Sequence, residues 1–165
     1  MWFNTYATEW GTGAIIMSDN GLAGLIFPQQ SEEALEQEIE RKFGACAYDE
    51  TIGDDLISTI GRYLSGEPVQ FAYQVDYGNA TEFERTVYNN LKAIPYGKMT
   101  TYAGLASLCG RPKAARAVGN AMAKNPVPIV VPCHRVLKSD GSVGGWSGKR
   151  GWKERLLSLE GIGVE

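Results

Sequence analysis

The chain has 165 residues, 44% of them hydrophobic, and this composition excludes intrinsic disorder and suits one compact unit or two small ones. No apolar run approaches the roughly 20 residues that span a bilayer, and residues 1–10 lack the basic and apolar stretches of a signal peptide, so we expect a soluble, cytoplasmic or nucleoid-associated protein. The net charge of −3 divides into −10 for residues 1–80 and +7 for residues 81–165, and a basic C-terminal half points modestly to nucleic acid.

The N-terminal part of the sequence predicts a sheet followed by two helices. Residues 2–27 predict a small antiparallel sheet, because short apolar runs are interrupted by glycines and by the turn Asp19-Asn20-Gly21. Ser31 can cap the first helix, and the negative charges of the glutamates in its first turns interact favourably with the helix dipole. A second helix is predicted for residues 54–64, and residues 67–80 are typical of an extended connection.

A second domain is predicted to begin at Thr81, where the string Thr81-Glu82-Phe83-Glu84 forms a capping box ahead of a helical apolar pattern. We therefore divide the chain into domains of residues 1–80 and 81–165. Two short helices are predicted at 101–108 and 112–124, with a tight glycine turn between them, as in a helix-turn-helix. The second of these helices contains both basic and small residues. This combination indicates either a helix that approaches DNA closely or one that packs tightly on a neighbouring helix. A strand at 127–131 and a helix at 152–159 are predicted after it.

A cysteine and the only histidine of the chain are adjacent, at Cys133 and His134. These residue types supply the nucleophile and base of thiol chemistry, although a lone buried cysteine more often fills a core. Neighbouring side chains diverge on a strand or a helix, so contact between them requires a bend after Pro132 or a bridging water. With three cysteines and no CxxC pair, the sequence indicates neither a disulfide framework nor a cysteine-rich zinc site.

The string NPVPIVVPCHRV, residues 125–136, closely resembles the active-site signature of the O6-alkylguanine-DNA alkyltransferases, also called methylated-DNA-protein-cysteine methyltransferases. The resemblance includes PKAARAVG at 112–119, GWSG at 145–148 and KERLL at 153–157, and covers about residues 81–161. It implies a DNA repair protein that transfers the alkyl group of O6-alkylguanine irreversibly to Cys133 in a single turnover, and it leaves O4-alkylthymine open as a second substrate. The implied fold is an α/β N-terminal domain of RNase H-like type, with a supporting role, followed by a mainly α C-terminal domain with a winged helix-turn-helix that binds DNA and carries the reaction.

The resemblance also assigns roles to individual residues. Cys133 is the nucleophile, His134 the base that acts through a water, and Glu160 the carboxylate that orients the imidazole. The remaining roles are a proton donor to the departing guanine (Tyr102), an arginine finger that replaces the flipped-out nucleotide (Arg116), neighbouring DNA contacts (Ala115, Lys113), a hinge (Asn125) and a substrate pocket (Val136, Trp146, Ser147, Met122). Many relatives have Tyr at the position of Trp146, which leaves the tolerance for bulky alkyl groups open. Without the resemblance, Glu160 is typical of a surface acid, Tyr102 of core packing and Arg116 of a phosphate contact or an exposed charge.

The implied partner is alkylated DNA, preferably a duplex with the damaged base flipped out, bound by a monomer. No cofactor is expected, because the lesion is the alkyl donor and the protein is the acceptor. Some relatives hold zinc in the N-terminal domain, but residues 1–80 offer Cys46 and no histidine, so we expect no metal.

Two alternatives compete with this hypothesis. A cysteine hydrolase is disfavoured because such enzymes usually bring their histidine from distant sequence, and this chain has no second histidine. A non-catalytic sensor of alkylated DNA is disfavoured because relatives that only sense carry another residue at the position of Cys133.

Overall fold

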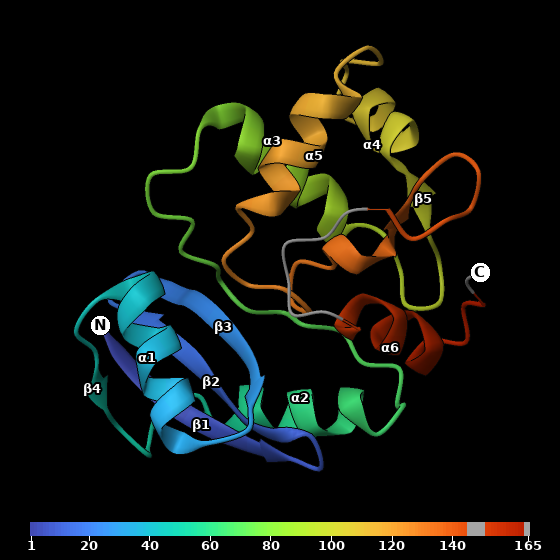
Figure 1. Cartoon of the computed structure of the whole chain (residues 1–165). Helices are drawn as coiled ribbons and strands as arrows, with labels where there is room; N and C mark the ends of the chain where they lie inside the picture. Colours follow the sequence, from blue (N-terminus) through green and yellow to red (C-terminus); the bar gives the residue numbers. More distant parts are fainter. Residues whose placement is uncertain (145–150, 164–165) are drawn as a thin grey trace. The chain divides into compact units, whose positions relative to one another are not determined.

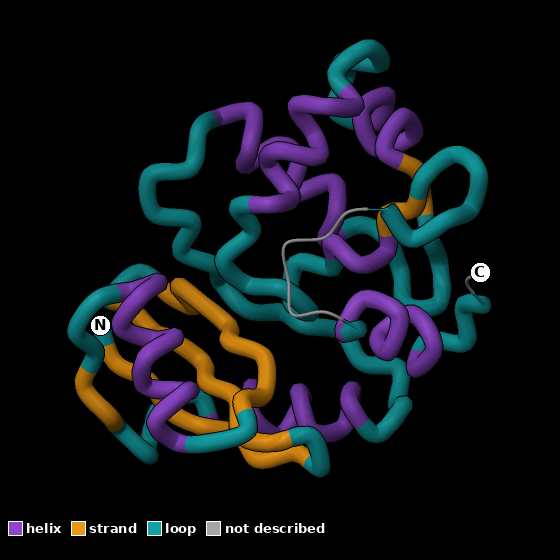
Figure 2. The backbone as a smooth tube through the Cα atoms, viewed as in Figure 1, coloured by secondary structure: helices purple, strands orange, loops and turns teal. Residues whose placement is uncertain are grey.

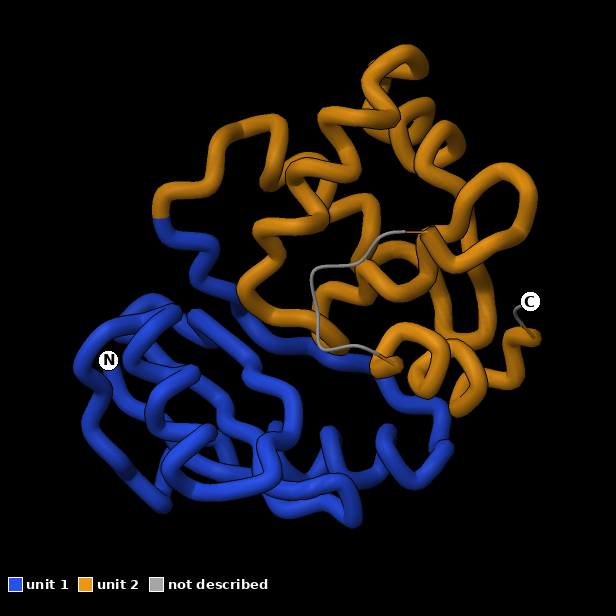
Figure 3. Tube along the Cα trace, viewed as in Figure 1, with its two compact units in different colours: residues 1–78 blue, residues 79–165 orange. Residues whose placement is uncertain are grey.

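The structure, a computed structural model, describes residues 1–144 and 151–163. The chain divides into two compact units, Met1–Gly78 and Asn79–Glu165 (Figure 3). Figure 2 shows that the first unit contains the larger sheet and that the described part of the second is mainly helical. Within the described residues, no helix has both the length and the apolar character that crossing a membrane requires.

A four-stranded sheet forms the centre of the first unit (Figure 1). Its strands lie in the order β3-β2-β1-β4, and β1 pairs antiparallel with β2, as β2 does with β3, so the predicted antiparallel sheet is confirmed. The short edge strand β4 pairs parallel with β1. The strands are β1 (Trp2–Thr8), β2 (Gly11–Ser18), β3 (Gly21–Gln29) and β4 (Ala47–Tyr48).

Two helices complete the first unit, as predicted: α1 (Glu32–Phe43) and α2 (Asp54–Leu64). The Ser31 side chain accepts a hydrogen bond from the Ala34 amide at 3.1 Å and caps α1. One core cluster combines the buried α1 residues with strand residues that include Ile16. Ile15, which points to the opposite face of the sheet, lies against the start of α2. Strand β2 is therefore buried on both faces, which explains its continuous apolar run.

Three helices form the body of the second unit: α3 (Glu82–Lys92), α4 (Tyr102–Leu108) and α5 (Ala115–Ala123). The predicted capping box is confirmed, because the Thr81 hydroxyl accepts from the Glu84 amide at 3.1 Å and the Glu84 carboxylate accepts from the Thr81 amide at 2.9 Å. The Tyr88 hydroxyl donates to the Ala121 carbonyl oxygen at 2.8 Å and connects α3 to the end of α5. Helices α3, α4 and α5 also contact one another in each pairing, so they share a core.

The connection between α4 and α5 differs from its prediction. Gly110, with φ of +74°, ends α4 in a Schellman motif: its amide donates to the Ser107 carbonyl and the Arg111 amide donates to the Ala106 carbonyl. A further turn follows, in which the Ala114 amide donates to the Arg111 carbonyl at 2.9 Å. Because of this turn, α5 begins at Ala115 and not at the predicted residue 112.

The strand predicted for residues 127–131 was wrong, because this segment forms a turn. The prolines at 126, 128 and 132 carry no amide hydrogen and cannot donate to a strand ladder. The Val131 amide instead donates to the Val127 carbonyl at 2.9 Å, and Ile129 adopts a φ of +74°, in the left-handed region. The apolar run is buried in an irregular conformation that its periodicity alone did not indicate.

The rest of the described chain leads through a short helical turn to the last helix. The 3-10 helix η1 (Cys133–Arg135) continues into β6 (Val136–Leu137), which pairs parallel with β5 (Thr100–Thr101). Helix α6 (Trp152–Leu159) confirms the predicted C-terminal helix and packs against η1.

Candidate active site

Cys133 begins the 3-10 helix η1 directly after a sharp bend. Pro132 has φ of −81° and ψ of 66°, and the Cys133 amide donates to the Val131 carbonyl at 2.8 Å, which is the geometry of an inverse γ-turn. The bend that communication between Cys133 and His134 requires is therefore present. The Cys133 thiol belongs to a buried residue.

His134 and Glu160, predicted to act together, are in direct contact. His134 Nε2 lies 2.8 Å from Glu160 Oε1, and both side chains are fully buried. A carboxylate accepts hydrogen bonds and donates none, so Nε2 carries the hydrogen and Nδ1 is the basic nitrogen of the neutral imidazole. The contact joins η1 to the residue after α6 and excludes the reading of Glu160 as a surface acid.

Arg135 binds the same carboxylate, a role that the sequence does not indicate beyond the place of Arg135 in the string PCHRV. Its Nε lies 2.9 Å from Glu160 Oε2 and its Nη2 lies 2.8 Å from Oε1, while Nη1 donates to the Ile94 carbonyl at 2.6 Å. The Gly97 amide donates to Glu160 Oε2 at 3.1 Å. Glu160 therefore accepts from an imidazole, a guanidinium and a backbone amide in one buried network.

The surroundings of His134 favour its neutral form. Burial lowers the pKa of His134 most, the hydrogen bond and negative charge of Glu160 oppose that effect, and the positive charges of Arg135 and Lys153 lower the pKa further. A neutral imidazole at neutral pH can accept a proton, as a general base must.

A stability measurement tests this reading of His134. Its pKa is lowered from 6.5 in the folded state, so on acidification the unfolded chain gains a proton that the folded chain does not. We expect the free energy of unfolding in urea to fall as pH decreases below about 6.5, by up to about 1.4 kcal/mol per pH unit. Because His134 is the only histidine, His134→Asn should flatten this dependence between about pH 7 and 5. An unchanged slope in the variant would assign the effect to other groups.

Tyr102 begins α4, where the Thr101 hydroxyl accepts from the Gly104 amide at 3.0 Å and caps the helix. Burial, and then the negative charge of Cys133, raise the pKa of Tyr102, so the phenol keeps its proton. A Cβ atom at Gly144 would lie 3.3 Å from the Tyr102 hydroxyl, and Gly144 has φ of +76°. A side chain at residue 144 would therefore be strained and would crowd this hydroxyl.

Asn125, the predicted hinge residue, stabilises the irregular segment before Cys133 through two side-chain hydrogen bonds. Its Nδ2 donates to the Val131 carbonyl at 2.8 Å, and its Oδ1 accepts from the Val127 amide at 3.1 Å. One side chain thereby fixes both ends of the turn that carries Ile129 in its left-handed conformation. The segment is therefore positioned by hydrogen bonds from the Asn125 side chain, whereas a strand is positioned by backbone hydrogen bonds to its neighbour.

The predicted DNA contacts and pocket residues occupy different environments. Arg116 and Lys113 are exposed and Ala115 is half-buried, whereas Val136 and Met122 are buried. Trp146 and Ser147, the remaining predicted pocket residues, lie outside the described residues. The exposed basic side chains can reach a partner in solution, while the buried pair belongs to the interior around η1 and α5.

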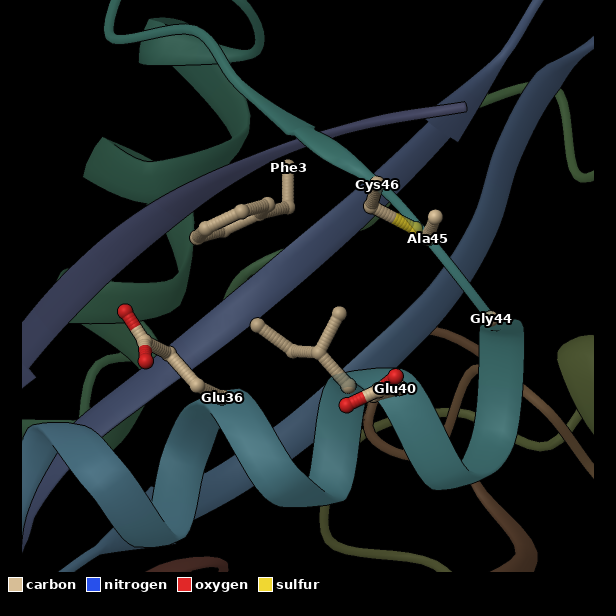
Figure 4. Close-up of a pocket in the computed structure, with 7 residues that line it drawn as sticks. Phe3, Glu36, Glu40, Gly44, Ala45 and Cys46 are labelled. Carbon is tan, nitrogen blue, oxygen red and sulfur yellow. The ribbon is translucent and has the colours of Figure 1, made fainter.

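A separate pocket of about 230 Å³ lies in the first unit, between α1 and the segment that follows it (Figure 4). Burial raises the pKa of the Cys46 thiol there, and the charge of the chain's amino terminus opposes this less strongly. The pocket is lined by Phe3, Glu36, Ile39, Glu40, Gly44, Ala45 and Cys46.

Among the described residues, no group of three or more histidine, cysteine or acidic side chains has a geometry that could hold a metal ion.

The part of the sequence that contains Cys133 is similar to known proteins. Residues 82–162 match the family described as "6-O-methylguanine DNA methyltransferase, DNA binding domain". A methylated-DNA–protein-cysteine methyltransferase of Methanothermobacter thermautotrophicus is 40% identical over 111 residues, which cover 67% of this chain and 62% of that protein. The protein of the same name from Rattus norvegicus is 53% identical over 79 residues, which cover 47% of this chain and 38% of that protein. The aligned part of the chain thus spans less than two thirds of these curated relatives.

Solved structures match over nearly the whole chain. The crystal structure of Mycobacterium tuberculosis O6-methylguanine methyltransferase has a TM-score of 0.79 and 30% sequence identity, and the match covers 96% of this chain and 92% of that one. A structure of the Mycobacterium tuberculosis protein in complex with DNA matches with a TM-score of 0.81 and 29% identity, over 97% of this chain and 92% of that one. The similarity therefore includes the first unit as well as the second.

Proposed function

Because the chain belongs to the 6-O-methylguanine DNA methyltransferase family, we propose that it repairs DNA by transferring the alkyl group of O6-alkylguanine to the sulfur of Cys133. The observation that carries this proposal is the buried sequence Cys133-His134-Arg135, whose histidine and arginine share the carboxylate of Glu160. The product is a thioether, whose carbon–sulfur bond is stable to hydrolysis, so each molecule acts once. O4-alkylthymine would present the same kind of alkyl–oxygen bond.

The reaction is a displacement at saturated carbon and requires an ionised sulfur. The Cys133 thiol gives its proton through a water to Nδ1 of His134, and Glu160 stabilises the imidazolium that results. As the sulfur–carbon bond forms, the carbon–O6 bond breaks and its electron pair passes to the guanine ring. Arg135 and the Gly97 amide keep the Glu160 carboxylate in place during this proton transfer.

The departing base requires a proton, because a neutral guanine leaves more readily than an anion. Tyr102 supports this step, since burial and the charge of Cys133 keep its hydroxyl protonated and able to donate. If Tyr102 passes its proton to guanine, the imidazolium proton of His134 returns to the Tyr102 oxygen through water, so over the whole reaction the thiol loses one proton and guanine gains one. The reaction therefore requires no cofactor. Val136 and Met122, with Trp146 and Ser147, would form the pocket for the flipped-out base.

The second unit would bind the damaged duplex. We propose that α4 and α5 form the helix-turn-helix of a winged DNA-binding domain, with Arg116 entering the base stack and Ala115 and Lys113 beside it. Arg116 and Lys113 are exposed, which supports this role. The first unit would be the RNase H-like supporting domain, and the protein would act as a monomer in the cytoplasm or nucleoid, where its DNA substrate lies.

The proposed function is tested by mixing the protein with a duplex that contains one O6-methylguanine, followed by intact mass and peptide mapping. We expect a gain of one methyl group, confined to Cys133 and saturating at one per protein molecule. A matched duplex with unmodified guanine is the control and should leave the mass unchanged. Binding of the methylated duplex without a gain in mass would favour the sensor alternative. Absence of both binding and mass gain would reject the repair function itself.

A further inference from the structure

A second charged group, Lys153 in α6, is buried beside the proposed reaction centre, and the function proposed above does not use it. Its side chain belongs to a residue that is 1% exposed, and its Nζ has no hydrogen-bond partner among the described residues. Burying an ammonium group is costly unless a negative charge compensates it. A methionine of similar length would fill the same space without that cost, so the lysine calls for a functional explanation.

The groups around Lys153 belong to the site. Its Nζ lies 5.7 Å from the centre of the Tyr102 ring, on α4. On η1, Cys133 and His134 both interact electrostatically with it: the Cys133 charge raises the pKa of Lys153, and the Lys153 charge lowers the pKa of His134. On its own helix, the exposed Glu154 also raises the pKa of Lys153.

Among the neighbours of Lys153 that the structure describes, none supplies a buried and unengaged negative charge as long as Cys133 is a neutral thiol. Burial, the largest effect, lowers the pKa of Lys153 to about 8 even though the negative charge of Cys133 opposes it, so the ammonium form predominates at neutral pH when Cys133 is ionised. The carboxylate of Glu160 is engaged by His134 and Arg135, and Glu154 is exposed to solvent. Among these neighbours, the Cys133 thiolate is the buried anion that the reaction itself creates.

We propose, on the basis of the function proposed above, that Lys153 is the counter-charge of the Cys133 thiolate and promotes ionisation of the thiol before alkyl transfer. Lys153 acts through Cys133 and contributes no bond to the substrate. When the sulfur becomes a neutral thioether, Lys153 loses its counter-charge, while the His134 imidazolium stays paired with Glu160 and is repelled by the positive charge of Lys153. Their repulsion favours loss of the imidazolium proton, which balances the proton that guanine has taken up.

The first test measures ionisation of Cys133 without DNA. Iodomethane is added to the protein across about pH 5 to 10, and peptide mapping gives the rate of methylation at Cys133. We expect Lys153→Met to raise the pH midpoint of this rate by about one unit or more, and so to slow methylation about tenfold at pH values well below the midpoint of the unsubstituted protein. Lys92→Met removes an exposed lysine from α3 and should leave the midpoint unchanged. An unchanged midpoint in folded Lys153→Met would overturn the proposal.

The second test uses the unsubstituted protein and remains informative if Lys153→Met fails to fold. With ¹³Cε-labelled lysine, nuclear magnetic resonance follows the titration of Lys153 before and after Cys133 has been methylated by iodomethane. We expect methylation to lower the pKa of Lys153, because it removes the thiolate charge. An identical titration in both forms would overturn the proposal. Neither test involves damaged DNA, so failure of the repair function would be seen separately, in the duplex experiment.

Discussion

Cys133→Ala is expected to abolish methyl transfer from an O6-methylguanine duplex while binding of the duplex is retained. The substitution removes the thiol of the residue next to His134, and among the residues that the structure describes at this site no other side chain is a comparable nucleophile. DNA binding should persist because the exposed residues of α5 are unchanged. Intact mass after incubation measures transfer, and a fluorescence or gel-shift titration measures binding.

Cys109→Ala is the matched control for this prediction. Cys109 is partly exposed, and its sulfur accepts a hydrogen bond from Asn90 at 3.7 Å. Burial raises the pKa of the Cys109 thiol, and this effect exceeds the lowering by the Asn90 hydrogen bond. A thiol that stays protonated is a poor nucleophile, so the control variant should gain one methyl group at Cys133 at the rate of the unsubstituted protein. Detection of the methyl group on another residue in Cys133→Ala would remove Cys133 from the mechanism.

Elements with strong local signals were predicted well from the sequence. The Ser31 cap and the Thr81 capping box each lie immediately before an amphipathic pattern, and both helices begin as predicted. The strand predicted at 127–131 does not form because the segment contains and is flanked by prolines, which cannot donate to a strand ladder, and because Asn125 determines the conformation through side-chain hydrogen bonds. Such bonds depend on tertiary context and leave no periodic signal.

The candidate site was predicted in part. Contact between His134 and Glu160 is present, as the resemblance implied, whereas the catalytic roles of both remain proposals. Arg135 and Lys153 were not singled out, because arginine and lysine are mostly exposed in proteins and neither has a hydrophobic or spacing signal that predicts burial. Their burial follows from the packing of α6 on η1, which brings residues far apart in the sequence together.

Glu160→Gln is expected to lower both stability and the rate of transfer. The amide keeps the shape of the carboxylate but removes its charge and one acceptor oxygen, while Arg135 and His134 remain buried donors. Breaking a buried ion pair in this way costs about 3–5 kcal/mol, so we expect the free energy of unfolding in urea to fall by about that amount. Loss of an oriented general base should slow methyl transfer by about 10²-fold or more.

The two effects of Glu160→Gln can be separated because the proposed reaction stops after one turnover. The final amount of methylated protein reports the folded, competent fraction, whereas the rate constant reports the chemistry of the molecules that react. Glu154→Gln, an exposed substitution on α6, should change the free energy of unfolding by about 0.5 kcal/mol or less. A normal rate constant with a reduced final amount would limit Glu160 to holding Arg135 and η1 in place. A slowed rate constant at full final amount would identify Glu160 as the residue that orients His134 for proton transfer.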